Sequence, residues 1–472
     1  MHIASITTCA DVDRDVSQLA DVNVFEAAGR VCIRGERSGG NVPRIHESGN
    51  FGTDTIDRMT SVRPRHVLVV NQHGDNRGDE AALDGMLRGI EERCDGVRFT
   101  VIHQFGNDQS ARRMRPDVEW ITLKLPIIEA ARLLLYLLFR LCGIRPRVLL
   151  GRIGRATVAA YESADVVVSA PGGPYFGDIY IDHEPVHWLY VWMGALHRKP
   201  CVLYATSAGP FRKRWANPFR RFTYRRFDAL FVREEISAGH IRGLFGARAR
   251  VPEVQVSVDA ALQVAVEPAE RASSRALIVV SAINWPYKDD PDPDSRRAVY
   301  DDAVALAVLR LAGSEACDVV LVPQLHGTAH RDAPYLGHLA DLIRNRANDL
   351  DVVVTVFDEN ADMRAQRALF ASADWVIAGR YHPAVFALSA GVPQLCIPYE
   401  HKATGVLQLA GLGDLVLPIE DVTSERVERL VDHLRANRED IARRSAAAAV
   451  ALREVSGRTS AAVVTVMEAG AR

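Results

Sequence analysis

The chain has 472 residues, of which 48% are hydrophobic and 25% are charged, and its formal net charge is -2. These values exclude a disordered or fibrous protein, and the charge balance argues against a nucleic-acid partner, because such proteins carry a basic surplus. The seven cysteines are scattered without a C-x-x-C pair, so we expect neither a zinc site nor a disulfide framework. Cysteine usage and the absence of a secretory leader pattern predict a protein of the reducing cytoplasm.

The segment 1–65 differs from the rest of the chain. It contains scattered glycines and few sustained apolar runs, so we expect a poorly structured N-terminal extension. Met59 stands shortly before the first strongly apolar run. We therefore hypothesise that translation starts at Met59 and that residues 1–58 are not translated.

From residue 66 onward, short apolar runs alternate with helical patterns, which is typical of parallel sheets covered by helices. The predicted strands are 67–70, 98–103, 166–170, 201–206 and 229–232, followed by 276–282, 318–322, 352–357, 375–378 and 394–397. A stretch rich in Ala, Glu and Pro separates the two series. We therefore predict an α/β protein of two Rossmann-like doubly wound domains, 66–265 and 276–420, with C-terminal helices over 421–472. Such a GT-B-like architecture binds ligands in the cleft at the carboxyl ends of its strands.

The leucine-rich stretch 125–142 predicts an amphipathic helix. Glu129, Arg132 and Arg140 interrupt it, and it is short for a membrane span. We expect it to be buried in a domain interface. Docking on a membrane surface is the alternative, and it leaves open a location at the inner face of the membrane.

Polar and glycine-rich segments follow the strands of the first series. The segment 76–80, Asn-Arg-Gly-Asp-Glu, opens a helix after the first strand. Asn76 and Asp79 are candidates for binding sugar hydroxyls, whereas capping of the helix is the structural alternative for Asp79. Gly172 and Gly173, with Asp178 beyond them, indicate room for a ligand or a tight turn and should face the same cleft.

Arg233 stands where the fifth predicted strand ends. It either serves the site or pairs with Glu234 or Glu235. Exposed pairs contribute only about 0 to 1 kcal/mol, so stability explains its position poorly.

The segment 378–383, Ala-Gly-Arg-Tyr-His-Pro, predicts a strand, a charged turn and a helix. Pro383 suits a first helical position and Gly391 marks the stop, so Arg380 and His382 are expected beside free N–H groups at a helix start. Such a corner suits an anion, although simple capping or solvation of the turn is the alternative. Lys402, near the next helix start, is a candidate phosphate contact or a solvated surface residue.

Several common catalytic patterns are missing from the chain. It contains no G-x-S-x-G elbow, no H-E-x-x-H pair, no P-loop and no strict G-x-G-x-x-G spacing. Serine hydrolases, zinc proteases, P-loop enzymes and nicotinamide-dependent enzymes are therefore disfavoured.

Taken together, these segments resemble the polysaccharide pyruvyl transferase family over roughly residues 66–415. The matching segments are 76–81, 171–173, 207–210, 232–237, 258–261, 380–382 and 391–393, followed by Tyr399 and Lys402. The chain departs from the family at Pro174, where a third glycine is common, and around Thr206 and Ala208, where Gly-Gln-Ser-Ile-Gly-Pro is common. Pro174 removes one N–H donor that a glycine would supply.

The resemblance implies transfer of a pyruvyl group from phosphoenolpyruvate to two hydroxyls of a sugar, which gives a cyclic ketal and phosphate without a metal or cofactor. It implies that Arg380 and Lys402 hold the donor and that Arg233 assists. His382 is then the general acid/base or only a phosphate ligand. The full set of expected site residues is His382, Arg380 and Asp79 for catalysis, Arg380, His382, Lys402 and Arg233 for the donor, and Asn76, Asp79, Gly172, Gly173 and Asp178 for the acceptor.

The partners expected on this basis are phosphoenolpyruvate and a saccharide acceptor, lipid-linked or free. Two other functions stay open at this point. One is a GT-B glycosyltransferase with a nucleotide-sugar donor, and the other is a saccharide-binding protein without catalytic activity.

Overall fold

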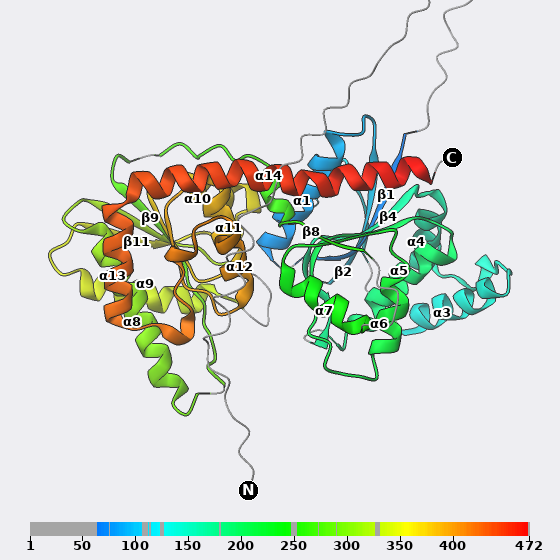
Figure 1. The fold of residues 1–472 in the computed structure, drawn as a ribbon, viewed down its shortest axis with the longest axis horizontal. Helices are drawn as coiled ribbons and strands as arrows, with labels where there is room; N and C mark the ends of the chain where they lie inside the picture. Colours follow the sequence, from blue (N-terminus) through cyan, green and yellow to red (C-terminus); the bar gives the residue numbers. More distant parts are fainter. Residues whose placement is uncertain are drawn as a thin grey trace, which may run out of the picture. The chain divides into compact units, whose positions relative to one another are not determined.

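Two parallel β-sheets organise the described part of the chain (Figure 1). The computed structural model describes residues 64–470, apart from 75, 106–111, 113–114, 123–126, 179–180, 247–252, 272, 289 and 326–330. The expectations for 1–65, including a translation start at Met59, lie outside the described residues except at positions 64 and 65. All described residues belong to one compact unit.

The larger sheet has eight strands in the order β3-β2-β1-β4-β6-β7-β8, with β5 paired to β6. Its central strands are buried on both faces, as expected of apolar strands in a parallel sheet. The strands are β1 (His66–His73), β2 (Arg98–Phe105), β3 (Glu119–Thr122), β4 (Val166–Ser169), β5 (Gly172–Phe176), β6 (Cys201–Ala208), β7 (Ala229–Val232) and β8 (Val254–Val256).

The smaller sheet has five strands in the order β11-β10-β9-β12-β13. They are β9 (Ala276–Ser281), β10 (Cys317–Leu321), β11 (Val352–Val356), β12 (Trp375–Ala378) and β13 (Gln394–Cys396). In both sheets the strand order reverses beside the first strand, between β1 and β4 and between β9 and β12. Doubly wound sheets bind ligands at the carboxyl ends of the strands beside such a reversal.

Helices connect the strands, and further helices follow the last strand. They are α1 (Arg77–Glu91), α3 (Ile127–Leu141), α4 (Arg152–Ser163), α5 (Glu184–Leu196), α6 (Asn217–Tyr224), α7 (Glu235–Phe245), α8 (Pro293–Ala312), α9 (Ala333–Ala347), α10 (Met363–Ser372), α11 (Tyr381–Ala390), α12 (His401–Leu409), α13 (Ser424–Ala436) and α14 (Arg438–Ala469). Short 3-10 turns are η2 (Arg147–Leu149), η4 (Ala260–Gln263), η5 (Gly413–Leu415) and η6 (Ile419–Asp421).

Local signals explain the limits of several helices. Asn76 caps α1, because its side-chain oxygen accepts a hydrogen bond from the Gly78 N–H at 2.8 Å. Gly391 ends α11 in a left-handed conformation with φ of 73°. Pro383 is the third residue of α11 and not the first, because the helix already begins at Tyr381.

All ten predicted strands are present, with ends that shift by a few residues. The short strands β3, β5 and β8 were not predicted. Gly172 and Gly173 begin β5 where a tight turn was one expectation. The Thr206 hydroxyl donates to the carbonyls of both glycines and helps to hold this segment beside β6.

The last helix, α14, contributes to both hydrophobic cores (Figure 1, red). Ile441 and Leu452 belong to the core around the smaller sheet, whereas Val463 and Met467 belong to the core around the larger sheet. One continuous helix therefore ties the two sheets together. The domain limits 66–265, 276–420 and 421–472 stay predictions.

The amphipathic helix predicted over 125–142 is α3. Its inner side chains Leu133 and Tyr136 are buried, but Leu134, Leu138 and Leu141 are 54%, 53% and 71% exposed. The expected burial in a domain interface is therefore wrong for the described structure, because no described element covers this face. No helix in the described ranges combines the length and apolarity needed to cross a bilayer.

We expect Met467→Ala to lower the free energy of unfolding by about 2 to 5 kcal/mol, because it removes a fully buried side chain from the core around the larger sheet. Val450→Ala is the matched control on the same helix, since Val450 is exposed, and should change stability by less than about 0.5 kcal/mol. Urea unfolding of both variants measures the difference. Equal effects would contradict the packing of the end of α14 on the larger sheet.

Candidate functional site

One cavity of about 130 Å³ lies at the carboxyl ends of strands from both sheets. It is bounded by the start of α1 after β1, the end of β7, the start of α11 after β12 and the start of α12 after β13. Its lining residues are Asn76, Asp79, Gly173, Arg233, Gln324, Arg380, Tyr381, His382, Pro383, Tyr399, Glu400 and Lys402. The structure thus brings together every predicted site residue except Gly172 and Asp178.

Two helix starts without side-chain caps meet at this cavity. The residues at the N-caps of α11 and α12 are Arg380 and Glu400, and neither side chain caps its helix. The first backbone N–H groups of both helices therefore lack the usual side-chain acceptor. Such helix starts attract anions through their N–H groups and dipoles.

Three cationic side chains line the same cavity. Arg380 donates to Asp332 at 2.6 Å, and its Nε finds no hydrogen-bond partner among the described residues. Lys402 lies 3.0 Å from Glu400. Arg233 is the third cation. Because Arg233 and Arg380 are each fixed by a buried carboxylate, they are held in place before any ligand arrives.

The buried carboxylate of Asp259 organises one wall of the site. Its Oδ2 accepts from Arg233 Nη1 at 2.7 Å and lies 3.7 Å from His382 Nε2, and its Oδ1 accepts from the Ala261 N–H at 2.9 Å. Burial alone would raise the pKa of Asp259, but His382, Arg233 and the amide donor together lower it. Arg233 also donates to the Ser207 hydroxyl at 2.8 Å, and its guanidinium stacks 4.4 Å from the ring centre of Tyr381.

His382 is held against the start of α1. A Cβ atom added to Gly78 would lie 1.8 Å from the Nδ1 atom of His382, so only glycine fits at position 78. Burial lowers the pKa of His382 to about 4, which the nearby carboxylate of Asp259 opposes and Arg233 and Lys402 reinforce. The imidazole is therefore neutral at pH 7 and able to accept a proton.

The pKa of Asp79 shifts in the opposite direction to that of His382. Burial raises the pKa of its carboxyl group to about 7, although Arg233 and Lys402 oppose the shift. Within the described part of the chain, no hydrogen-bond donor reaches this carboxyl group. A substantial fraction of Asp79 is therefore protonated at neutral pH, so this residue of the cavity lining carries a proton that it is able to donate.

Gly172 and Asp178 lie outside the lining of the cavity. Gly172 has φ of +126°, and a Cβ atom there would lie 2.8 Å from Asp79 Oδ1, so the glycine makes room for Asp79. Asp178 accepts from the buried Arg220 at 2.9 Å and from the N–H of Arg212 at 2.7 Å. These contacts hold a loop together, and they do not support the acceptor role predicted for Asp178.

Sequence reasoning missed four residues that shape the site. Asp259 and Ser207 lie in segments that carried the resemblance, but without an assigned role. Tyr381 stands between two predicted residues and was not singled out. No motif in the sequence points to Asp332, because it meets Arg380 only in the folded chain.

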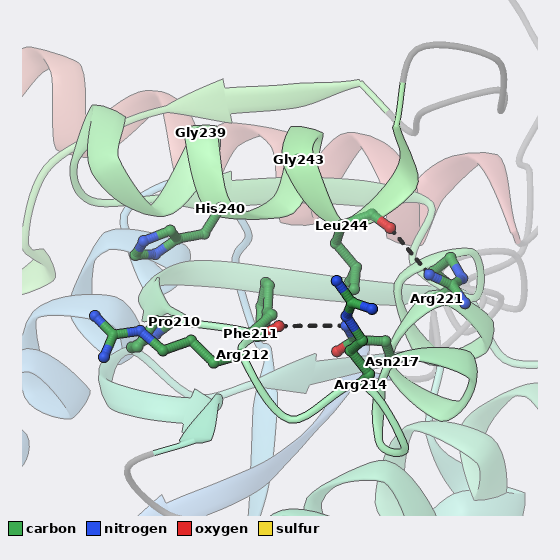
Figure 2. A pocket seen from close by; sticks show the side chains of 10 residues that line it. All are labelled: Pro210, Phe211, Arg212, Arg214, Asn217, Arg221, Gly239, His240, Gly243 and Leu244. Carbon is green, nitrogen blue, oxygen red and sulfur yellow. Dashed lines mark hydrogen bonds between the residues drawn. The ribbon is translucent and has the colours of Figure 1, made fainter. Parts of the chain in front are cut away.

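Two further hollows continue from the cavity. One of about 300 Å³ shares Tyr399, Glu400 and Lys402 with it. Another, of about 660 Å³, shares Pro210 and His240 with the second (Figure 2). The three form a run that begins at the cationic cavity and ends between α6 and α7.

A model of the polysaccharide pyruvyl transferase family matches residues 76–401. The chain belongs to this family. The match begins at the cap of α1 and ends at the first residue of α12, so it includes every lining residue of the cavity except Lys402. Among curated relatives, the chain is 22% identical over 410 residues to the amylovoran biosynthesis protein AmsJ of Erwinia amylovora, which covers 79% of this chain and 93% of that protein.

Solved structures show the same fold. An α,α-trehalose 6-phosphate synthase of Burkholderia multivorans matches with a TM-score of 0.52 and 12% identity, over 87% of this chain and all of that chain. A UDP-N-acetylglucosamine 2-epimerase matches with a TM-score of 0.53 and 11% identity, over 87% of this chain and 97% of that chain. The predicted GT-B-like architecture of two Rossmann-like units is confirmed. At these identities the likeness concerns the fold alone.

We expect Gly78→Ala to lower the turnover of this transferase by about 10²-fold, because a Cβ atom at position 78 displaces His382 and misplacement by about 1 Å carries such a loss. Gly337→Ala is the matched control, since an added Cβ there meets no atom within 4 Å. Turnover and circular dichroism of both variants provide the comparison. An active Gly78→Ala enzyme would mean that the position of His382 does not matter.

Proposed function

We propose that this protein transfers the pyruvyl group of phosphoenolpyruvate to two hydroxyls of one sugar in a polysaccharide or its precursor, forming a cyclic ketal. The observation that carries the proposal is the convergence of Arg233, Arg380 and Lys402 with two uncapped helix starts around one small cavity. Phosphoenolpyruvate is a small molecule with a phosphate and a carboxylate, so it matches this charge arrangement. Family membership supports pyruvyl transfer in general.

Arg380 and Lys402 hold the anionic groups of the donor in this proposal. The fork of an arginine suits phosphate or carboxylate through paired hydrogen bonds, and lysine adds a point charge. The free Nε of Arg380 and the N–H groups at the start of α11 supply further donors. Arg233, fixed by Asp259, stabilises negative charge from the opposite wall.

Asp79 and His382 divide the proton transfers. Protonated Asp79 donates to the methylene carbon of the enol, which leaves a cationic centre at the adjacent carbon. The first sugar hydroxyl attacks this centre and passes its proton to the neutral imidazole of His382. Phosphate then leaves and takes the proton from His382. The second hydroxyl closes the ring and returns a proton to Asp79, so the enzyme ends as it began.

Asn76, Asp79 and Gly173 contact the reacting sugar of the acceptor from one wall of the cavity. The rest of the acceptor extends into the run of hollows, which leaves the cavity at Tyr399, Glu400 and Lys402. This run offers room for sugar units beyond the one that reacts. Its walls include the Ser207 hydroxyl and the Glu234 and Glu400 carboxylates, which are groups that bind sugar hydroxyls. The acceptor is a saccharide, lipid-linked or free, and no metal or organic cofactor takes part.

The proposed location is the cytoplasm, including the inner face of the membrane. The five cysteines that the structure describes are all free thiols, which suits a reducing compartment. Phosphoenolpyruvate as co-substrate suits the same compartment.

Incubation of the purified protein with phosphoenolpyruvate and a panel of saccharide acceptors tests the function. We expect release of inorganic phosphate together with a glycan whose mass increases by one pyruvyl ketal. Lys402→Met should raise KM for the donor more than it lowers kcat, because it removes a ground-state contact. Glycosyl transfer from a nucleotide sugar without phosphate release would replace the proposal by a glycosyltransferase.

The pH dependence tests the roles of the two proton carriers. The donor form of Asp79 exists below its pKa of about 7 and is lost above it, so we expect kcat/KM for phosphoenolpyruvate to fall as the pH rises through about 7. Asp79→Asn should lower kcat/KM by about 10²- to 10⁴-fold and abolish this fall.

His382→Gln is the companion variant, and it should lower turnover while it keeps the fall near neutral pH. The ionisation of the substrate is common to all three enzymes, so their profiles are directly comparable. An Asp79→Asn profile with the wild-type shape would remove Asp79 from proton transfer, and full turnover of His382→Gln would remove His382.

A further inference from the structure

A large apolar face lies on the larger-sheet part of the molecule, away from the residues of the active site. Helix α3 exposes six large hydrophobic side chains, and the chain directly after it exposes two more. These residues are Ile128, Leu134, Leu135, Leu138, Phe139, Leu141, Ile144 and Val148. Leu133, Tyr136 and Leu137 anchor the helix to the body, so its position is set by packing. Monomeric proteins rarely expose so many apolar side chains on one element without a function.

The apolar face continues from α3 onto α5 and α6. A groove of about 500 Å³ separates these helices, and α3 and α6 lie along the same edge (Figure 1). Its lining residues are Leu134, Leu137, Leu138, Leu141, Leu189, Trp192, Met193, Ala195, Leu196, Phe222 and Arg226. Trp188, Trp192 and Phe219 stack beside it, and Phe219, Phe222 and Trp215 are exposed. Leucines with tryptophan and phenylalanine are typical of faces that enter the headgroup region of a bilayer.

The charge around this face is strongly one-sided. Residues 127–155 contain six Lys and Arg and one acidic residue, and residues 211–226 contain seven Lys and Arg and none. The whole chain, by contrast, has a formal net charge of -2. Arg147 is paired with Glu162 and Arg220 with Glu184 and Asp178, so these two are neutralised locally. The other arginines around the groove keep the surface cationic.

A basic hollow adjoins the apolar groove across α6. It is lined by Arg212, Arg214, Arg221 and His240, and no carboxylate is part of its lining (Figure 2). Arg221 donates to the Leu244 carbonyl, but neither the Arg212 nor the Arg214 guanidinium has an ion-pair partner in the described ranges. Both side chains are exposed. Unpaired arginines beside an apolar groove suit the phosphates of lipid headgroups.

We propose that the face formed by α3, the groove between α3, α5 and α6, and the basic segment 211–226 docks on a bilayer that contains anionic phospholipids. The apolar side chains of α3 enter the boundary between headgroups and acyl chains, while the arginines contact the phosphates. The 15-residue helix is too short to span the bilayer, so the attachment is peripheral.

The arrangement of charge disfavours a second copy of this chain as the occupant. A symmetric dimer presents the same patch from both subunits, so the cationic borders would face each other without acidic partners. An anionic lipid surface neutralises the same charges. The hollow that ends the run from the active site lies in this basic region, so an acceptor carried in the membrane would meet the open end of that run.

Co-sedimentation with vesicles of phosphatidylcholine, with and without phosphatidylglycerol, tests the proposal. We expect the wild type to bind the anionic vesicles about tenfold or more tightly than the neutral ones, and the binding to weaken as salt is added. Leu134→Glu with Leu138→Glu should lower the partition coefficient by about tenfold or more. The matched control is Val353→Glu with Val450→Glu, which places two charges on exposed apolar positions elsewhere and should bind as the wild type does.

The double variant Arg212→Glu with Arg214→Glu measures the electrostatic contribution to membrane binding. It should reduce binding to anionic vesicles and make that binding depend less on salt concentration. The proposal is overturned if the wild type does not bind anionic vesicles, or if the α3 double variant binds them as tightly as the wild type does. It is also overturned if sedimentation shows a wild-type dimer that the α3 variant converts to a monomer without any vesicle binding. Turnover of a soluble acceptor should be unaffected in the α3 variant, so failure of the proposed transferase activity and failure of docking are separate outcomes.

Discussion

The buried carboxylate of Asp259 is the interaction on which the candidate site depends. It joins Arg233 from the end of β7 to His382 from the start of α11, and its own backbone carbonyl accepts from Ser456 of α14. A buried charge raises the free energy of the folded state unless it is paired and hydrogen-bonded. Separation of Asp259 from its partners would therefore destabilise the fold. The two sheets are therefore held together at the place where the donor is proposed to bind.

Burial at this site moves two neighbouring groups in opposite directions. It raises the pKa of Asp79 to about 7 and lowers that of His382 to about 4. At neutral pH one group therefore carries a proton and the other is able to accept one, which is the separation that acid and base chemistry needs in a single cavity. Gly78 and Gly172 allow this arrangement, because a side chain at either position would occupy the space of His382 or Asp79.

The cationic cavity and the apolar face are built from different structural elements. The cationic cavity lies at the carboxyl ends of the strands, where helix starts supply N–H groups. The apolar and basic face is built on α3, α5 and α6, whose outer side chains no described element covers. Between them, the 211–226 segment follows β6 and carries both the end of the run of hollows and the arginines at the border of the groove.

Much of the fold was predictable from the sequence because strand and helix periods are local. The ten main strands, the amphipathic helix α3 and the helix stop at Gly391 follow from runs of neighbouring residues. The short strands β3 and β8 were not predictable in this way, since their pairing partners decide them. The glycine pair that begins β5 is a local pattern typical of a turn. In the structure the Thr206 hydroxyl on β6 donates to both glycine carbonyls, and the segment is a strand.

The motifs at the strand ends were enough to indicate the family and most residues of the cavity, because each motif is contiguous and a parallel sheet brings its strand ends to one edge. The partners of those residues, in contrast, depend on contacts between segments that are far apart in the chain. Asp332 reaches Arg380 across 48 positions, and Asp259, at the start of η4, reaches His382 at the start of α11. The exposure of α3 and the hydrogen bond from Arg220 to Asp178 likewise depend on the folded arrangement. Burial and long-range pairing depend on which segments meet in space, and no local pattern of residues encodes that.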